Sequence, residues 1–534
     1  MAPPLRANDV LTIFFIRSPA DIPLALDAPP DCLRSVGVAA AAPRFTHQIF
    51  PDEEIVGYAP GLAIRLLYTA GSMMSYLAIT GAADAEVEKD PDVAPRRGDA
   101  GAEDIVPVTC PRGVGGGGRG ARAAKRADAA ARRPSGGGSG NSAEKTDIVG
   151  RLARHVAPSA VSSVNEFVAA AAMPWSPPLP PSCVVAEYTL SPRPPVSGST
   201  VDGVNGGGGA DRGSGGGGNG GGSATSADRG GVYRVYKCRL NDHPDALAYH
   251  KRIQAHAMLH INNASYIDDA DPRWEIFFTW WFPDDATDGG SDGGDGHGVE
   301  FVAYATIYPF AVYEVAPPVA PTHPRVGRTA RAPGGGHRGG GDGGGGSGGR
   351  FRDRVRIAQV LVIPPHQRMG HGSHLLSAIY ADAAARDATE VTVEDPSAGC
   401  RSLRDVTDLR RALSAGLLPR APEALSYDAV PGVVERLRRS LRVTAGQARR
   451  VVEMHLLRGV AGGKGVGAEG AGVDEGGEGV DGGGRAWRLF VKRRLWVEWE
   501  EVLGPVAEGA ARKAKLAEIY ADVLEEYRAV LQRL

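Results

Sequence analysis

The chain has few cysteines, almost no net charge and no long hydrophobic run. Its 534 residues include five cysteines, none in a Cys-x-x-Cys or Cys/His spacing, which argues against a disulfide framework or a zinc site and is typical of a reducing compartment. No apolar run reaches the roughly 18 residues of a membrane span, and no basic region followed by an apolar core opens the sequence, so neither a membrane anchor nor a secretory signal is expected. A formal net charge of −2 does not favour direct binding to nucleic acid.

Glycine is the residue in excess. The 74 glycines are roughly twice the ordinary share of about 7%, and they gather in tracts with Ser, Ala and Arg and almost no large apolar side chains. Such segments cannot bury enough apolar surface to offset the entropy lost on ordering, so we predict that they are disordered insertions. The tracts cover residues 112–140, 202–223, 284–298, 333–350 and 460–485.

The rest of the chain is long enough for a substantial core, and its pattern predicts an α/β (α+β) protein in three parts. The predicted ranges are 1–83 with 146–195 for an N-terminal domain, 232–400 for a central domain, and 401–534 for a helical region. Insertions interrupt them at residues 84–145, 196–231, 284–299, 316–350 and 460–485. Apolar side chains at helical spacing also predict single helices over residues 148–172 and 243–267.

One stretch, residues 354–395, has the order of a β-loop-α-β unit. Residues 357–363 are mostly β-branched and apolar, as in a strand buried on both faces, and two prolines end them because proline cannot donate to a ladder. A loop follows and opens a helix whose apolar positions repeat at helical spacing. A second strand over residues 391–393 ends in Glu394 and Asp395. The loop reads Gln367, Arg368, Met369, Gly370, His371, Gly372 and Ser373.

The start of that helix is a candidate anion site. The first N–H groups of a helix have no intrahelical partner, and the helix dipole adds positive potential there. Gly370 and Gly372 lack the Cβ atoms that would keep a pyrophosphate away from this backbone. The alternative is an ordinary glycine loop that only caps the helix.

This unit resembles the acetyl-CoA signature of the Gcn5-related acetyltransferases, (Gln/Arg)-x-x-Gly-x-(Gly/Ala). Its flanks, residues 359–376 and 393–397, resemble the catalytic subunit of the type B histone acetyltransferases. The resemblance implies a mixed, mostly antiparallel sheet flanked by helices, with an N-terminal α/β domain that binds a histone tail and a C-terminal helical region. It also implies acetyl-CoA as the co-substrate, while the spacing of the cysteines and histidines indicates no metal. The residues assigned to the cofactor are Val360, Leu361 and Val362, the seven loop residues named above, and Ser397.

Two adjacent carboxylates, Glu394 and Asp395, are the candidate catalytic groups. A lysine amine is protonated at neutral pH, because its ordinary pKa is about 10.4, so direct attack on a thioester needs a base. Glu394 ends the strand that follows the cofactor helix, and repulsion from Asp395 would favour its taking up a proton. Asp395 would point to the opposite face if the strand continued. The alternative is that these residues only cap the following helix.

The resemblance places the histone tail on three sequence features. They are the acidic triplet Asp52, Glu53 and Glu54, the aromatic Trp274, and the segment Tyr308, Pro309 and Phe310. Adjacent carboxylates can hold a basic peptide, and three exposed acids are also common in a solvated turn. One position departs from the family, which has a glutamate where this chain has Asn262. Asparagine cannot act as a base, so any accessory role falls to another group.

The predicted function is transfer of an acetyl group to lysines of newly made histones, with the tail of histone four as target. Histone three as its dimer partner, a WD-repeat histone chaperone, and a nuclear and cytoplasmic location follow from the same resemblance. Two alternatives stay open: an acetyltransferase with another amine acceptor, and an acyl-CoA-binding scaffold that carries histones without acetylating them. His256 and His260 have a spacing that can chelate a metal, but no acidic or cysteine residue accompanies them, so core or surface histidines are favoured.

Overall fold

The computed structural model describes residues 3–27, 38–81, 145–190, 230–284, 298–314, 350–422, 425–462, 482–506 and 508–534. The predicted insertions lie mostly outside these residues and stay predictions there. The ends of the last one are wrong, because residues 460–462 and 482–485 are helical. The chain forms two compact units. Unit 1 comprises Met1–Thr306 and Gln359–Leu375, and unit 2 comprises Ile307–Ala358 and Leu376–Leu534.

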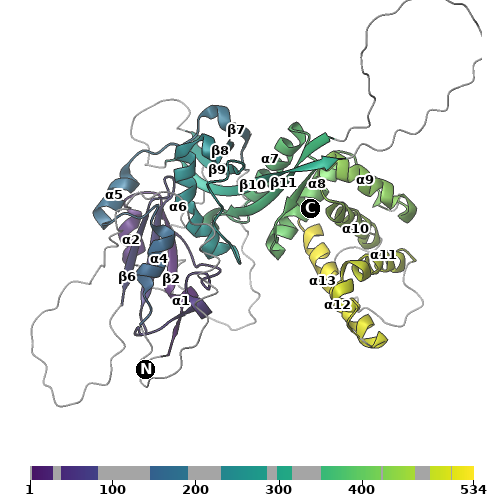
Figure 1. The fold of residues 1–534 in the computed structure, drawn as a ribbon, viewed down its shortest axis with the longest axis horizontal. Helices are drawn as coiled ribbons and strands as arrows, with labels where there is room; N and C mark the ends of the chain where they lie inside the picture. The colour runs from purple at the N-terminus through teal and green to yellow at the C-terminus, as the bar shows by residue number, and fades with distance from the viewer. Residues whose placement is uncertain are drawn as a thin grey trace, which may run out of the picture. The chain divides into compact units, whose positions relative to one another are not determined.

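A four-stranded sheet forms the N-terminal part of unit 1 (Figure 1). Its order is β3-β2-β5-β6, with β2 parallel to β5 and the other pairs antiparallel. Both faces of β2 are buried: Ile13 and Phe15 join one core cluster, and Phe14 and Ile16 join another. The strands are β2 (Leu11–Ile16), β3 (Ala39–Ala41), β5 (Ala63–Thr69) and β6 (Ser75–Thr80). Two short strands, β1 (Leu5–Arg6) and β4 (Glu54–Ile55), pair separately.

The single helix predicted over residues 148–172 is wrong, because two helices occupy this stretch. They are α4 (Ile148–Val156) and α5 (Val164–Ala172). The connection between them pairs with the sheet instead: the N–H of Ser75 donates to the carbonyl of Ser159 at 2.7 Å, and the N–H of Val161 donates to that of Ser75 at 2.9 Å. The hydroxyl of Ser163 then caps α5. These hydrogen bonds end the first helix, which helical spacing alone does not reveal.

A six-stranded sheet carries the predicted β-loop-α-β unit, in the order β12-β11-β10-β9-β8-β7. The strands are β7 (Val184–Tyr188), β8 (Gly231–Arg239), β9 (Glu275–Pro283), β10 (Glu300–Glu314), β11 (Arg350–Val362) and β12 (Glu390–Val393). Antiparallel pairing joins β7 to β8 and β8 to β9, while β11 and β12 are parallel. The predicted mixed sheet with flanking helices is therefore confirmed.

Burial along β11 differs from the prediction of a strand buried on both faces. Val355, Ile357, Gln359 and Leu361 are buried, whereas the residues that alternate with them, Arg356, Ala358 and Val360, are only partly buried. The strand is therefore covered well on one face and incompletely on the other. An apolar run of β-branched residues indicates a buried strand, but it does not show how completely each face is covered.

The helix α6 (Pro244–His260) packs on the small sheet within unit 1 and is shorter than predicted. It ends at His260 because Ile261 adopts an extended conformation and Asn263 has a positive φ of 54°. His256 and His260 are 0% and 6% exposed and belong to the core. Asn262 consequently lies in the turn after the helix and is exposed.

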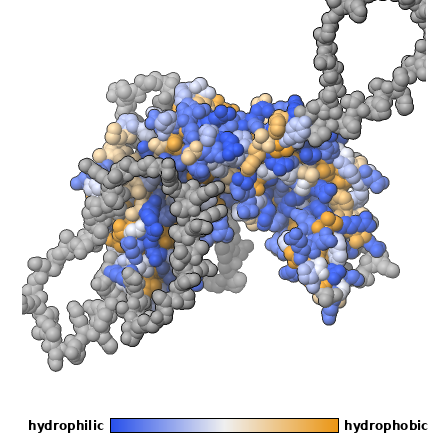
Figure 2. Space-filling model, viewed as in Figure 1, coloured by the Kyte–Doolittle hydropathy of each residue, from blue (hydrophilic) through white to orange (hydrophobic). Residues whose placement is uncertain are grey.

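Unit 2 contains the rest of the sheet and a set of helices, drawn in green to yellow in Figure 1. The helices are α7 (His371–Ala385), which begins in unit 1, α8 (Ala398–Ser414), α9 (Val430–Leu441), α10 (Ala445–Gly462), α11 (Gly482–Glu498), α12 (Glu500–Leu503) and α13 (Gly509–Leu531). Most of the visible surface is hydrophilic, with scattered apolar patches (Figure 2). Among the described residues no helix is long and apolar enough to cross a membrane.

Candidate active site

The predicted cofactor loop lies between β11 and α7, in unit 1. Arg368 and Gly370 have positive φ values of 67° and 103°. A Cβ atom on Gly370 would meet only Leu190, at 4.0 Å, so this glycine is needed for its backbone conformation rather than for space. The carbonyl of Gly370 accepts from the N–H of Ser373 at 2.9 Å. Among the described residues the N–H groups of His371 and Gly372 have no hydrogen-bond partner, which leaves them available to an anion.

Two sets of contacts fix the approach to this loop. The Gln367 side chain donates through Nε2 to the carbonyl of Val362 at 2.8 Å and accepts through Oε1 from Arg44 at 3.2 Å. One residue earlier, the buried His366 lies 3.7 Å from a carboxylate oxygen of Glu300, which also pairs with Arg17 at 3.0 Å. The loop therefore starts from a position that is tied to several elements of unit 1.

The edge of β11 is the second feature of the site. Residues Arg354 to Ile357 pair in parallel with Glu390 to Val393, and the N–H of Glu394 donates to the carbonyl of Ile357 at 2.9 Å. The strand β12 ends there, but β11 continues through residues 358–362. Those residues include Val360, Leu361 and Val362, the predicted partners of the cofactor. A strand edge that its neighbour has left can hydrogen-bond an extended ligand as an added strand.

Glu394 follows β12 within unit 2. Its carboxylate is 44% exposed and lies 3.4 Å from Nε of Arg356. That guanidinium in turn lies over the ring of Phe310, 4.6 Å from its centroid. The sequence did not single out Arg356, although its position on β11, one residue before the partner of Val393, follows from the parallel register.

The helix after Glu394, α8, is not capped by Glu394 or Asp395, contrary to the alternative interpretation. The hydroxyl of Ser397 accepts from the N–H of Cys400 at 3.2 Å, so Ser397 is the cap of α8 and the capping role proposed for Glu394 is wrong. Asp395 has a positive φ of 36°, so the strand does not continue through it and its side chain does not follow the strand alternation. Ser397 remains a predicted cofactor residue whose hydroxyl already accepts a hydrogen bond.

The predicted tail-binding residues occur in both units. In unit 1 the triplet lies in a turn and β4: Asp52 and Glu54 are exposed, whereas the Glu53 carboxylate turns back to the N–H of Thr46 at 3.4 Å. That backbone hydrogen bond lowers the pKa of Glu53. Trp274 is partly buried against the core of unit 1. In unit 2 Tyr308 is 9% exposed, its ring lies 4.7 Å from that of Phe310, and Pro309 and Phe310 are partly buried.

The segment before the triplet is attached to the end of α6. The N–H groups of Arg44 and Phe45 donate to the carbonyl of Leu259 at 2.8 and 3.1 Å. The side chain of Gln48 donates to the carbonyls of Met258 and Ile261 at 2.8 and 3.0 Å. Arg44 thus connects this segment to Gln367 of the cofactor loop. No local sequence pattern predicts a role for Arg44, because its partners are remote along the chain.

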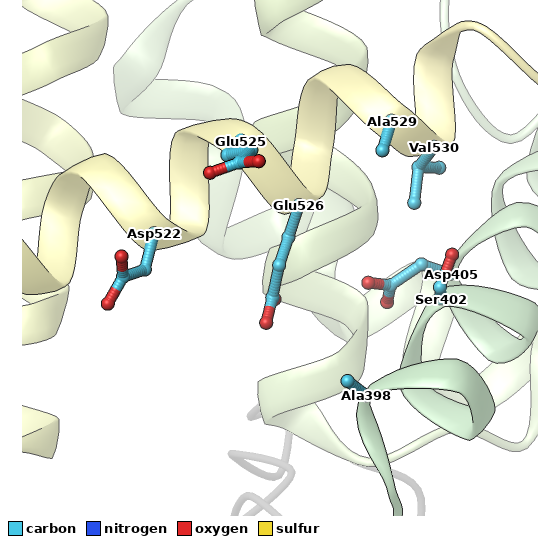
Figure 3. Close-up of a pocket in the computed structure, with 8 residues that line it drawn as sticks. All are labelled: Ala398, Ser402, Asp405, Asp522, Glu525, Glu526, Ala529 and Val530. Atoms are coloured by element: carbon cyan, nitrogen blue, oxygen red, sulfur yellow. The ribbon is translucent and has the colours of Figure 1, made fainter.

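A separate cavity of about 380 Å³ lies between α8 and α13 in unit 2, and it contains none of the predicted site residues. Figure 3 shows three acidic side chains on α13 and Asp405 on α8 around it. Asp405 is only 1% exposed, and it is satisfied by Gln447 at 2.9 Å and by Arg450 at 2.6 Å. Arg450 also pairs with Glu526 at 3.0 Å. These contacts join the helices, and we assign the cavity no role in the chemistry.

No group of three or more potential metal ligands occurs among the residues that the structure covers.

Comparison with known proteins confirms the resemblance. Residues 4–101 match a family model described as the N-terminus of the histone acetyl transferase HAT1. Three relatives are each named histone acetyltransferase type B catalytic subunit. That of Candida glabrata is 31% identical over 40% of this chain and 45% of its own length. Those of Cryptococcus neoformans and Pyricularia oryzae are 26% and 30% identical over 56% and 52% of this chain, and each over 59% of its own length.

The chain thus spans between 45% and 59% of the length of these relatives. Among solved structures, an aminoglycoside acetyltransferase from a soil metagenome in complex with sisomicin is 13% identical, covers 34% of this chain and 86% of its own, and has a TM-score of 0.18. A score this low supports no conclusion about the fold or the function. The sequence relatives therefore carry the comparison.

Proposed function

We propose that the protein transfers the acetyl group of acetyl-CoA to lysine side chains of newly made histones, with the N-terminal tail of histone four as the substrate. The observation that carries the proposal is the end of β12: the strand leaves β11 at Ile357, and Glu394 stands where it ends. Beyond that point β11 runs on into the cofactor loop. The similarity to type B catalytic subunits supports histones as the acceptor.

The donor would be held by backbone groups. The free N–H groups of His371 and Gly372, at the start of α7, suit the pyrophosphate. The edge of β11 at Val360, Leu361 and Val362 suits the amides of the pantetheine arm, which can hydrogen-bond to a strand in the manner of a further strand. A backbone N–H from this edge would also polarise the thioester carbonyl as negative charge develops on its oxygen.

Transfer then proceeds by direct attack. Glu394 takes one proton from the lysine ammonium, and the neutral amine attacks the thioester carbonyl carbon. The carbon–sulfur bond then breaks, and the second proton on the nitrogen is lost to the departing sulfur, so that CoA leaves as the thiol. The pair with Arg356 orients the carboxylate. Cys400 is not needed as a nucleophile, and burial raises its pKa, which disfavours the reactive thiolate.

The acceptor would be bound by charge and by aromatic contact. Asp52 and Glu54 are exposed and suit the basic residues of a histone tail. Phe310 is partly buried and offers apolar surface to the chain beside the lysine, and the buried Tyr308 supports its ring. Glu53 mainly holds the turn through Thr46. The proposal also includes a histone four–histone three dimer as substrate, a WD-repeat chaperone as companion, and action in both nucleus and cytoplasm. These three parts rest on the family resemblance of the sequence alone.

The test is an acetylation assay with two acceptors. Purified protein, acetyl-CoA and a histone four tail peptide should yield peptide that is heavier by one acetyl group at a lysine, as read by mass spectrometry. A small polyamine at the same amine concentration should react far more slowly. Faster reaction of the polyamine would favour the alternative acceptor. Tight binding of acetyl-CoA and peptide without any product would favour the scaffold.

A further inference from the structure

A cluster of aromatic rings lies beneath the first turn of α7. The hydroxyl of Tyr188, the last residue of β7, is 2.8 Å from Nδ1 of His371. The Tyr188 ring stacks on His374, with centroids 3.8 Å apart and planes within 2°, and on Tyr233 at 5.1 Å. The rings of Tyr233 and His371 are 4.6 Å apart. Tyr188 is thus held between two rings while its hydroxyl reaches a third, and all of these residues belong to unit 1.

His371 occupies a special place in the cofactor loop. Its side chain is 1% exposed, and it stands between Gly370 and Gly372, the two residues with the greatest backbone freedom. A loop that must present several N–H groups to one ligand binds better when its conformation is fixed beforehand. Gly370 and Gly372 have no side chains through which the backbone could be held. Contacts to the buried ring of His371 can therefore restrict the backbone conformation of this part of the loop.

The contact between the two rings is one of neutral partners. Burial lowers the pKa of His371 to about 3, and the nearby His366 and His374 add to this effect. Burial also raises the pKa of Tyr188, so its hydroxyl keeps its proton. The tyrosine hydroxyl can donate to or accept from Nδ1, so this hydrogen bond restricts the ring orientation of His371 in either neutral tautomer. The Nε2 atom of His371 is buried without a hydrogen-bond partner among the described residues. Within that part of the chain, the hydrogen bond from Tyr188 is therefore the one that holds the ring.

We propose that Tyr188 is a positioning residue for the cofactor: its hydroxyl holds the ring of His371 and thereby the free N–H groups at the start of α7. This inference rests on the proposed function, because it assumes that these N–H groups bind acetyl-CoA. It assigns to the end of β7 a role that the cofactor signature does not contain. Tyr188 would act through His371 and not on the reacting atoms.

The test compares two tyrosine-to-phenylalanine variants. Tyr188→Phe keeps the ring stacking and removes only the hydroxyl, and we expect KM and Kd for acetyl-CoA to rise roughly threefold to tenfold, the effect of one lost hydrogen bond. The kcat value and KM for the tail peptide should stay within about twofold of wild type. The matched control is Tyr249→Phe, because Tyr249 is 1% exposed and donates to the carbonyl of Gly71 at 2.7 Å, away from the loop in the contacts it makes.

The control should lose stability without any change in KM for acetyl-CoA. An unchanged KM and Kd in Tyr188→Phe would overturn the inference, and so would an equal rise in Tyr249→Phe, which would indicate general destabilisation. Calorimetric titration of the wild type with acetyl-CoA separates this result from failure of the proposed function. A wild type that binds no acetyl-CoA overturns both, whereas a wild type that binds it and a Tyr188→Phe variant that binds it equally overturn only the positioning role.

Discussion

Acid should destabilise unit 1 through the buried histidines of α6. His250 and His260 are 0% and 6% exposed, and their ring nitrogens have no hydrogen-bond partner among the described residues. Burial lowers the pKa of His250 to about 3 and that of His260 to about 4, from 6.5. Below pH 6.5 these histidines therefore bind protons in the unfolded chain, whereas in the folded state they stay neutral. The contribution of the neutral histidines to the free energy of unfolding is fully present above pH 6.5, and it is lost as the pH falls toward 4.

The size of the effect follows from these values. Between pH 7 and pH 5 the unfolded histidine becomes almost fully protonated while the folded one stays neutral, so each residue should lower the free energy of unfolding by about 2 kcal/mol. Because the carbonyls at the end of α6 hold Arg44, Phe45 and Gln48, the same loss should reach the segment that precedes the acidic triplet.

The assay is denaturant unfolding of the full chain at pH 7 and pH 5, with hydrogen exchange over residues 244–260 to assign the transition to unit 1. His260→Leu should reduce the difference between the two pH values by about 2 kcal/mol. The control Ile253→Val, a buried residue of the same helix, should lower stability by about 1 kcal/mol at both pH values and leave the difference unchanged. The reasoning fails if His260→Leu retains the full wild-type pH dependence.

Three further outcomes are expected. Replacing residues 52–54 with Ala should raise KM for a histone tail more than KM for acetyl-CoA, and the effect should shrink with salt because exposed charges are screened over about 10 Å at 0.1 M; equal effects on both substrates would point to misfolding. Deleting residues 333–350 and 460–485 should leave Tm and acetyl-CoA binding nearly unchanged, since these tracts have no large apolar surface to bury, and a drop of several degrees would contradict this. Arg44→Ala should weaken acetyl-CoA binding, because it removes a hydrogen bond that Gln367 of the cofactor loop accepts; an unchanged Kd in a calorimetric titration would count against it.

The parts of the fold that sequence reasoning predicted well are the local ones. Around Gly370 a strand, two prolines, two glycines and the start of a helix follow one another within about a dozen residues. Each can be predicted from the conformational preference of its own residues. The break between α4 and α5 was missed because Ser159 pairs with Ser75, far away along the chain. Helical spacing reports the exposed and buried faces of a segment, but it carries no information on a remote strand edge.

In the candidate site too, the local features were predicted from the sequence and the contacts between remote residues were not. Glu394 was predicted from the end of a strand, and the structure adds that Arg356 faces it and that Ser397, not Glu394, caps α8. Arg356 and Arg44 both depend on register or on remote contacts, which no local pattern encodes. The aromatic support of His371 could not be predicted either, because Tyr188 lies 183 residues before it in the sequence.

The most direct test of the central claim is the Glu394→Gln variant in the histone-tail assay, with Asp395→Asn beside it. Glutamine keeps the volume and hydrogen-bonding reach of Glu394 and removes its basicity, so acetyl-CoA should bind as before while kcat falls by roughly 10² to 10⁴ at neutral pH. Part of the rate should return at high pH, as more of the lysine amine becomes neutral without help. Near-normal turnover of Glu394→Gln at neutral pH would contradict the account, and a larger loss in Asp395→Asn would move the base to the neighbouring carboxylate.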